Sequence, residues 1–207
     1  MLKIWGRNTS SNVQKVMWAV GELGLAHERI DIGGKFGRNR EAAYLALNPN
    51  GLVPTLQDGD LTVWESNTIV RYLAARYGAG RLEPTDWEAR ALASQWMDWQ
   101  LSVVGPAIFG AFWGLIRTAP EQRDRKAIAA SQAKTTEAMQ IFDAFLANEP
   151  YAAGPAFSMG DIPFGIMAYR FRQLVPDRPA LSNFERWYKE IAERPAFKEH
   201  VSSIPLQ

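Results

Sequence analysis

The sequence predicts a small α/β unit followed by an all-helical unit. Up to about residue 78, short segments rich in β-branched and aromatic residues alternate with amphipathic helical patterns, whereas beyond residue 86 only helical patterns occur. A polar segment with glycine and proline, AGRLEPTD at 79–86, separates the two regions. We therefore expect one domain at residues 1–78, a linker at 79–86 and a second domain at 87–207.

In the first domain the order of elements predicts a mixed four-stranded sheet, βαβ–α–ββα. Gly24 follows the last apolar turn of the first helix, and Asp58-Gly59 is typical of a two-residue hairpin turn. The predicted elements are a strand at 2–5, a helix that begins at residues 10–12 and ends at 23, a strand at 27–32, a short helix at 41–47, hairpin strands at 55–57 and 61–63, and a helix at 66–77.

The second domain is predicted to be helical throughout. Its first helix contains Gly105-Pro106, where we expect a bend because proline lacks an N–H and clashes with the preceding turn. Ser158 and Asp161 have the spacing of a capping box at the start of a later helix. The predicted helices span 87–117, 120–146, a segment from about 157, 181–192 and 195–201.

Composition narrows the possible chemistry. The chain has no cysteine, which excludes disulfides, thiolate metal sites and a protein thiol nucleophile. Its two histidines, His27 and His200, are far apart in sequence, so neither a histidine metal site nor a Ser-His-Asp triad is expected. Net charge is +1 with scattered basic residues, which does not indicate nucleic-acid binding. We see neither a secretory leader nor an apolar run long enough to span a bilayer, and we expect a cytoplasmic protein.

The stretch from Asn48 to Leu73 carries the most specific signal. Pro54 precedes strand-like residues, a position that a sheet avoids except at an edge, and Glu65, Ser66 and Asn67 directly precede an apolar helical pattern. With these features, the chain resembles the cytosolic glutathione transferase superfamily over essentially its whole length. The residues that carry the resemblance are NPNGLVP at 48–54, WESN at 64–67, SSNVQKVMWAVGELGL at 10–25 and SMGDI at 158–162.

This resemblance implies a thioredoxin-like first domain with a cis Val53-Pro54 bond. In the family, the residue before that proline binds the cysteinyl backbone of glutathione. Ser66 at a helix N-terminus suits the γ-glutamyl carboxylate, because unpaired N–H groups and the helix dipole favour an anion there. Glu65 suits the ligand's ammonium, and Asn67 is a weaker candidate. The alternative for Ser66 is a plain helix cap.

A basic residue is expected at the glycine carboxylate of glutathione. Lys35, Arg38 and Arg40 are available in the preceding loop, and Arg40 is nearest to the family position by its spacing from Asn48-Pro49. Solvated loop charges are the alternative. Leu52 departs from the family, in which a polar or basic residue is often found at this position.

The resemblance implies a hydroxyl or other hydrogen-bond donor to the glutathione sulfur at the first strand–helix junction. No tyrosine precedes Tyr44, so the sequence resembles the serine-type or bacterial branches (theta-, beta- or nu-like). We take Ser10 as the first candidate and Asn12 as a second donor, with Thr9 and Ser11 close behind; helix capping is the alternative. A free thiol has a pKa of about 8.5, and a donated hydrogen bond plus a helix N-terminus lower it enough to give mostly thiolate at neutral pH.

The resemblance implies a homodimeric glutathione transferase that acts in detoxification. It would join glutathione, its co-substrate, to a small hydrophobic electrophile, or use the bound thiolate for peroxide reduction or dehalogenation, with no metal, nucleic-acid or membrane partner. Phe109, Phe112 and Trp113, followed by Ile116, are the candidate substrate wall, although such an aromatic stripe is also typical of a core. Arg117 either steers an anionic substrate or is a surface residue. A second hypothesis is a non-catalytic binding or assembly module.

Overall fold

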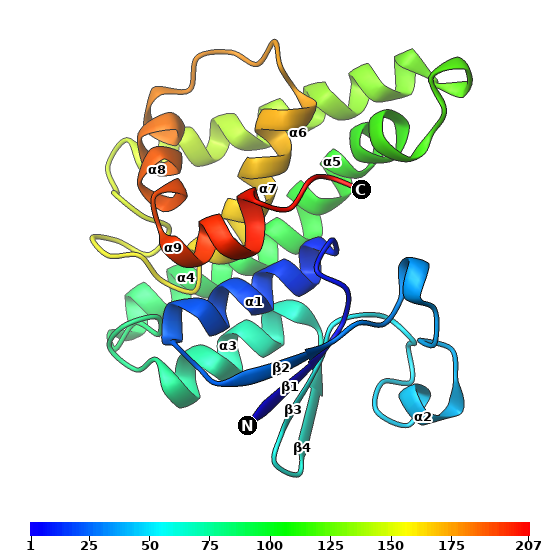
Figure 1. Cartoon of the computed structure of the whole chain (residues 1–207). Helices are drawn as coiled ribbons and strands as arrows, with labels where there is room; N and C mark the ends of the chain where they lie inside the picture. The colour runs from blue at the N-terminus through cyan, green and yellow to red at the C-terminus, as the bar shows by residue number, and fades with distance from the viewer. The chain divides into compact units, whose positions relative to one another are not determined.

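The computed structural model describes residues 1–207 and divides into two compact units (Figure 1). The first unit consists of residues 1–83 together with 195–204. The helical unit consists of residues 84–194 together with 205–207. The segment Pro195–Ile204 therefore packs within the first unit, although it follows the helical region in sequence.

The first unit is built on a mixed four-stranded sheet, as predicted. Its strands are β1 (Leu2–Trp5), β2 (His27–Ile30), β3 (Thr55–Asp58) and β4 (Leu61–Trp64), in the order β2-β1-β3-β4. The β1–β2 pair is parallel, and the β1–β3 and β3–β4 pairs are antiparallel. Because Asp58 pairs with Leu61, the hairpin turn is Gly59-Asp60, one residue later than predicted. Gly59 has φ +58°, which glycine adopts without strain.

Helices α1 (Ser11–Leu23) and α3 (Ser66–Tyr77) pack against each other and cover one face of this sheet (Figure 1). Their fully buried apolar residues recur at helical spacing, as in Val13, Val16 and Val20 of α1. Gly24 caps α1 in the left-handed conformation, as its position predicts. The shorter segments of the unit are the 3-10 helix η1 (Gly34–Phe36), α2 (Ala42–Leu45), α9 (Pro195–Phe197) and the π-helical turn η5 (Lys198–Ser202).

The long helix of the helical unit changes its winding next to Gly105-Pro106. It runs through α4 (Trp87–Trp99), the π-helical turn η2 (Gln100–Val104), α5 (Gly105–Phe112) and the π-helical turn η3 (Trp113–Arg117). Pro106 has no N–H to continue the α-helical ladder, and the Gly105 N–H bonds to the carbonyl of Gln100, five residues back. The irregularity predicted at this dipeptide is therefore a π-turn that precedes it.

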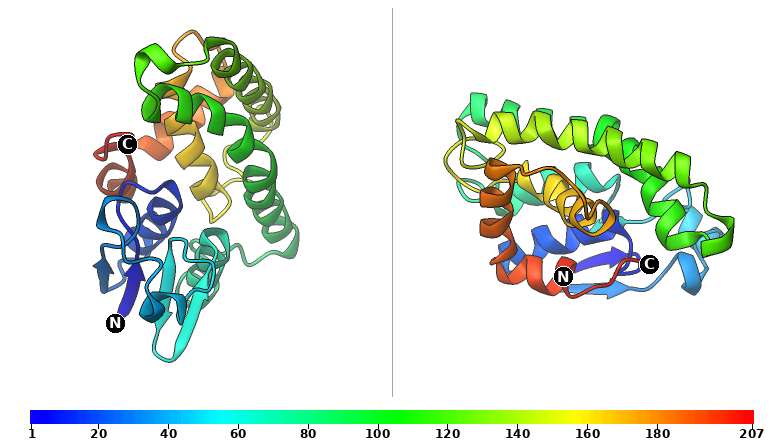
Figure 2. Two further views of the ribbon diagram at one scale, coloured as in Figure 1. Left: turned by 90° about the vertical axis from the view of Figure 1, so that its right-hand side faces the viewer. Right: turned by 90° about the horizontal axis from the view of Figure 1, so that it is seen from above.

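The other helices of this unit are α6 (Arg125–Leu146), α7 (Asp161–Leu174) and α8 (Ser182–Ala192), seen from two further sides in Figure 2. Helix α6 begins five residues later than predicted. Pro120–Gln122 forms a separate 3-10 turn, η4, and Asp124 caps α6 by accepting a hydrogen bond from the Ala127 N–H at 2.9 Å. Helix α7 is buried along nearly its whole length. Aromatic rings form the core of the unit, among them Trp96, Phe142, Phe164 and Trp187.

The predicted capping box at the start of α7 is present and extends further. Asp161 accepts from the Ser158 N–H at 2.9 Å, and the Ser158 hydroxyl accepts from the Gly160 N–H at 3.2 Å. Asp161 also accepts from the Trp187 indole at 2.8 Å. Burial of the carboxyl raises the pKa of Asp161 to about 6, although these hydrogen bonds oppose the rise.

The helix from Trp87 to Arg117 contains an 18-residue window of mean hydropathy 1.4, of which 22% is buried. Our expectation that no apolar run would approach this length was wrong. By length and composition the helix could cross a membrane, but one such helix is weak evidence, because core helices of soluble proteins pass the same test.

Candidate functional site

The peptide bond between Val53 and Pro54 is cis, as the family resemblance implied. Pairing of β1 with β3 starts at Thr55, so Val53 lies just outside the sheet, and its N–H and C=O make no hydrogen bond within the chain. Both groups are therefore available to an extended ligand. Gly6, at the end of β1, lies beside this residue: a Cβ atom there would come within 3.2 Å of the Val53 Cβ.

A buried hydrogen-bonded cluster holds the residues on either side of the Val53-Pro54 bond. The Tyr44 hydroxyl donates to the Leu52 carbonyl at 2.6 Å and lies 2.8 Å from the Thr55 hydroxyl. The Asn48 amide donates to the same two groups, at 3.0 and 3.2 Å. Burial raises the pKa of Tyr44, which keeps its hydroxyl protonated. We did not select Tyr44 from the sequence; the only signal was its position four residues before Asn48, one helical turn away.

The start of α3 has an unusual backbone. Glu65 has φ +74°, a conformation that side chains other than glycine rarely adopt, and its carboxylate is exposed. Ser66 follows as the first residue of the helix and is buried, with 5% of its surface exposed. The side chain of its N-cap residue, Glu65, makes no capping hydrogen bond. This helix end therefore lacks a cap from its N-cap residue, and the dipole of a helix N-terminus favours an anion.

The start of α1 is likewise uncapped. Ser10 is the N-cap residue by backbone geometry, but its hydroxyl makes no capping hydrogen bond. Ser10 therefore does not cap α1 through its side chain, which was the alternative to thiol binding. Asn12 is exposed, and its side-chain oxygen accepts a hydrogen bond from the Ser66 hydroxyl at 3.2 Å. Thr9 and Ser11 are half-buried at the same end of the helix.

Asn67 has a structural partner. Its side-chain oxygen accepts a hydrogen bond from Lys15, a lysine of α1 that is 1% exposed. This pair joins α1 to α3 close to their starts, and it places a lysine amine there that the sequence did not lead us to expect. The available signal was a lysine among the apolar residues of the first helix.

Of the basic residues proposed for the glycine carboxylate, Arg40 lies beside the turn that leads to Val53. Its guanidinium donates to the Asn50 carbonyl at 3.2 Å and packs against Gly51. Lys35 instead lies over the ring of Phe36, and Arg38 donates to the carbonyl of Asp31. Leu52, the departure from the family pattern, is 60% exposed.

These elements offer groups that complement an extended peptide with charges of both signs. Two uncapped helix starts favour anions, Glu65 offers a carboxylate to a cation, and Val53 offers one donor and one acceptor. No group of three or more His, Asp or Glu side chains is arranged to hold a metal ion.

Residues 1–75 match the family model "Glutathione S-transferase, N-terminal domain", and residues 95–195 match "Glutathione S-transferase, C-terminal domain". The chain belongs to the glutathione S-transferase family.

Individual relatives of this transferase cover all or nearly all of its length. The chain is 43% identical to "Glutathione S-transferase GstB" of Escherichia coli over 100% of both chains. A solved theta class glutathione S-transferase from Xanthomonas axonopodis pv. citri, with glutathione bound, is 45% identical to this chain and superposes with a TM-score of 0.95. The match covers 100% of this chain and 99% of that one. "Glutathione S-transferase F9" of Arabidopsis thaliana is 30% identical over 98% of this chain and 97% of its own.

The aromatic residues expected to line a substrate pocket in this transferase do not all share one environment. Phe109 and Trp113 are 58% and 54% exposed, and their rings stack with centroids 5.7 Å apart. Phe112 is buried, and the Arg170 guanidinium lies 4.3 Å from its ring centroid.

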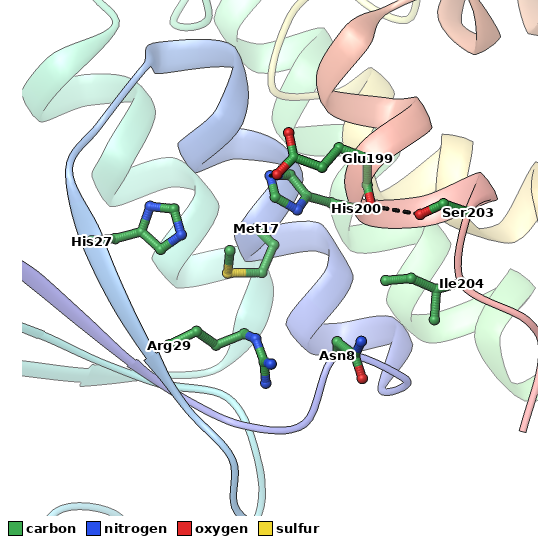
Figure 3. A pocket seen from close by; sticks show the side chains of 8 residues that line it. All are labelled: Asn8, Met17, His27, Arg29, Glu199, His200, Ser203 and Ile204. Carbon is green, nitrogen blue, oxygen red and sulfur yellow. Dashed lines mark hydrogen bonds and ion pairs between the residues drawn. The ribbon is translucent and has the colours of Figure 1, made fainter.

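Both histidines of the transferase line one cavity of about 460 Å³ in the first unit (Figure 3). Burial lowers the pKa of His200, and the nearby His27 and Arg29 lower it further, although Glu199 opposes the shift. The Arg29 guanidinium donates to the Gly6 carbonyl at 2.9 Å and pairs with Asp31. None of the residues expected to bind glutathione lines this cavity. Its full lining is Asn8, Met17, His27, Arg29, Glu199, His200, Ser203 and Ile204.

Proposed function

We propose that the first unit binds glutathione along Val53-Pro54 and activates its thiol for transfer to a small hydrophobic electrophile. The observation that carries this proposal is the pair of uncommitted main-chain groups on Val53, next to the cis proline and Gly6. An extended peptide that lies antiparallel to this residue satisfies both groups, in the manner of an added strand.

The charges then fix the direction of the tripeptide. The γ-glutamyl carboxylate lies at the Ser66 end of α3, where the helix dipole stabilises it. Its ammonium pairs with Glu65, and Asn67 supports this end through its bond to Lys15. The glycine carboxylate lies toward Arg40, with Lys35 as the second candidate. This orientation places the cysteinyl residue at Val53.

Ser10 supplies the hydrogen bond to the sulfur, with Asn12 as a second donor and Thr9 and Ser11 as alternatives. A hydrogen bond to a charged acceptor contributes about 1.5–3 kcal/mol, which lowers a thiol pKa by about one to two units. The uncapped start of α1 lowers it further. The resulting thiolate attacks the electrophilic carbon, forms the S–C bond and displaces the leaving group with its electron pair.

We further propose that the transferase is a cytoplasmic homodimer that functions in detoxification, with residues 1–78 and 87–207 as its functional domains. Exposed apolar residues on the helical unit support self-association, including Leu101, Val103 and Ile141, the last two of which line a cavity of about 480 Å³. Sedimentation equilibrium tests the dimer. The wall formed by Phe109, Phe112 and Trp113 is proposed to accept the electrophile's apolar body.

The decisive experiment is a pH titration of protein-bound glutathione that follows the absorbance of the thiolate. A bound pKa at least one unit below the free value of about 8.5 is expected. The Ser66→Ala variant should bind glutathione about tenfold more weakly, because one hydrogen bond to a carboxylate is lost. Binding without ionisation would favour a non-catalytic module, and unchanged affinity in Ser66→Ala would contradict the assigned orientation.

A further inference from the structure

Two guanidinium groups of the helical unit face the ring of one phenylalanine. Phe112 belongs to α5, and its ring centroid lies 4.3 Å from the Arg170 guanidinium of α7 and 5.8 Å from that of Arg117 in η3. Helices α5 and α7 pack against each other (Figure 1). The two cations therefore meet over one ring although they are 53 positions apart in sequence.

Arg170 is a buried cation without an anionic partner. Its side chain is among the buried charged groups, at 8% exposure, and its Nε atom has no hydrogen-bond partner. Burial and the positive charge of Arg117 lower the pKa of Arg170 to about 10, while only the Tyr169 hydroxyl acts in the opposite direction. No carboxylate is among the groups that influence it.

Other arginines of the same unit are paired. Arg172, two residues further along α7, forms an ion pair with Glu185, and Arg178 pairs with the same carboxylate at 3.2 Å. A buried, unpaired guanidinium is costly, and a cation–π contact offsets only part of that cost. A buried polar group left unsatisfied in this way needs an explanation, and an anionic ligand supplies one.

We propose that Arg170 and Arg117, both in contact with the Phe112 ring, form a binding site for the carboxylate of a small organic acid. A guanidinium binds a carboxylate through two parallel N–H···O bonds, and the unpaired Arg170 provides such a fork. Arg117 currently donates to the main-chain oxygen of Gln207 at 2.6 Å, so its guanidinium already holds one oxygen acceptor.

The chemistry around the two cations favours an acid with an aromatic body. Trp113 lies one helical turn before Arg117, and it is exposed and stacked on Phe109. For the proposed transferase, this site selects electrophiles that carry a carboxylate. Only the turnover part of the inference rests on the proposed function, because carboxylate binding can be measured without glutathione.

The test compares the binding of para-nitrobenzoate and para-nitrobenzamide, which have nearly the same shape but differ in charge, by calorimetry at constant ionic strength. We expect the unaltered protein to prefer the benzoate. In Arg170→Met, the benzoate should bind at least tenfold more weakly and the benzamide within twofold of its original affinity. Arg170→Lys should fall between, because it keeps the charge and loses the planar fork. Arg125→Gln, which removes an exposed cation of α6, is the matched charge control and should change neither affinity.

Thermal unfolding separates a binding role from a structural one. If Arg170 serves a ligand, Arg170→Met should unfold at the same or a higher temperature, because an uncompensated buried charge is replaced by an apolar side chain. Equal benzoate binding in Arg170→Met and the unaltered protein would overturn the proposal. So would an equal loss in Arg125→Gln, or no preference for the benzoate at the outset.

A second measurement distinguishes failure of this site from failure of the proposed function. Conjugation of glutathione to a chloronitrobenzoate and to the corresponding chloronitrobenzamide is followed in the same variants. We expect Arg170→Met to lower kcat/KM about tenfold for the benzoate alone. If neither compound reacts while benzoate binding still depends on Arg170, the anion site stands and the transferase activity does not.

Discussion

The hydroxyl of Ser66 donates a hydrogen bond to the side-chain oxygen of Asn12 at 3.2 Å, across 54 positions of sequence. This bond joins the starts of α3 and α1, the two helix ends to which we assign the γ-glutamyl carboxylate and the thiol of glutathione. One hydrogen bond therefore connects the two halves of the candidate site.

A double-mutant cycle measures that connection. Ser66→Ala, Asn12→Ala and the double variant should show a coupling in the free energy of unfolding of about 0.5–1.5 kcal/mol, the usual net contribution of one hydrogen bond. Urea unfolding of the four proteins gives this value. Strict additivity would mean that the two side chains do not interact.

Ser10 is expected to act on the thiol and not on helix stability. Because its hydroxyl makes no capping bond, Ser10→Ala should change the free energy of unfolding by less than about 0.5 kcal/mol. The same change should raise the pKa of bound glutathione by about one unit and lower kcat/KM about tenfold. Thr9→Ala and Ser11→Ala are the matched hydroxyl deletions. If one of these, and not Ser10→Ala, moves the pKa, the donor has been misassigned.

Glu65 combines a strained backbone with an exposed charge. A residue other than glycine in such a conformation costs about 1–3 kcal/mol of stability. A glycine would relieve this strain, but its greater conformational entropy in the unfolded chain offsets part of the gain. Glu65→Gly should therefore raise the free energy of unfolding by about 1 kcal/mol and weaken glutathione binding about tenfold, since the partner of the ammonium is lost. Glu65→Gln keeps the backbone and removes only the charge, so it should weaken binding without raising stability. Calorimetry and thermal unfolding separate these outcomes.

Tyr44 is expected to position the Leu52–Thr55 segment. Tyr44→Phe removes the donor to the Leu52 carbonyl and the hydrogen-bond partner of the Thr55 hydroxyl at once, and should cost about 1–3 kcal/mol of stability as well as weaken glutathione binding. Tyr72→Phe is the matched control, because its hydroxyl donates to Asp58 at 2.7 Å near the β3–β4 turn. Equal glutathione affinity in both variants would contradict a positioning role for Tyr44.

Asp161 gives the helical unit a defined pH dependence. Its folded pKa of about 6 lies above the ordinary value of 3.8, so between these values the folded state binds more protons than the unfolded state. The contribution of this group to stability is therefore full below about pH 4 and falls until about pH 6, by about 3 kcal/mol at most. Asp161→Asn removes this titration, but its amide N–H groups face donors that need an acceptor. The variant should therefore be less stable than the unaltered protein by about 1–3 kcal/mol at pH 4. The stability difference between the two proteins should shrink from pH 4 to pH 6; a constant difference would contradict the raised pKa.

Most of the fold could be predicted from the sequence because its helices and turns depend on residues that are close together in the chain. Gly24 and the apolar spacing of α1 and α3 fix their own conformations through steric and burial effects, and Gly59 marked the hairpin, although its turn lies one residue later than the Asp58-Gly59 dipeptide predicted. The start of α6 was misplaced because Pro120 fits a first helical turn as well as it fits the 3-10 turn, and Asp124 decides between them.

The candidate site was less accessible to sequence reasoning because its contacts are long-range. Lys15 and Asn67 are 52 positions apart, and nothing local to either residue indicates that a buried lysine meets an amide there. The same holds for Arg170 over Phe112, whose meeting depends on how α7 packs against α5. Periodicity along a helix identifies its buried face but not the side chain that it meets.

The return of Pro195–Ile204 to the first unit has a consequence for biosynthesis. Trp18 of α1 is fully buried, and its ring meets the edge of Phe197 at 4.9 Å, while Ala196 lies against Gly21. All four strands are therefore synthesised before the residues that cover this tryptophan. The amino-terminal unit is completed only when residues 195–204 have been translated, so an apolar face of α1 stays uncovered in the nascent polypeptide and is open to chaperones until these residues emerge.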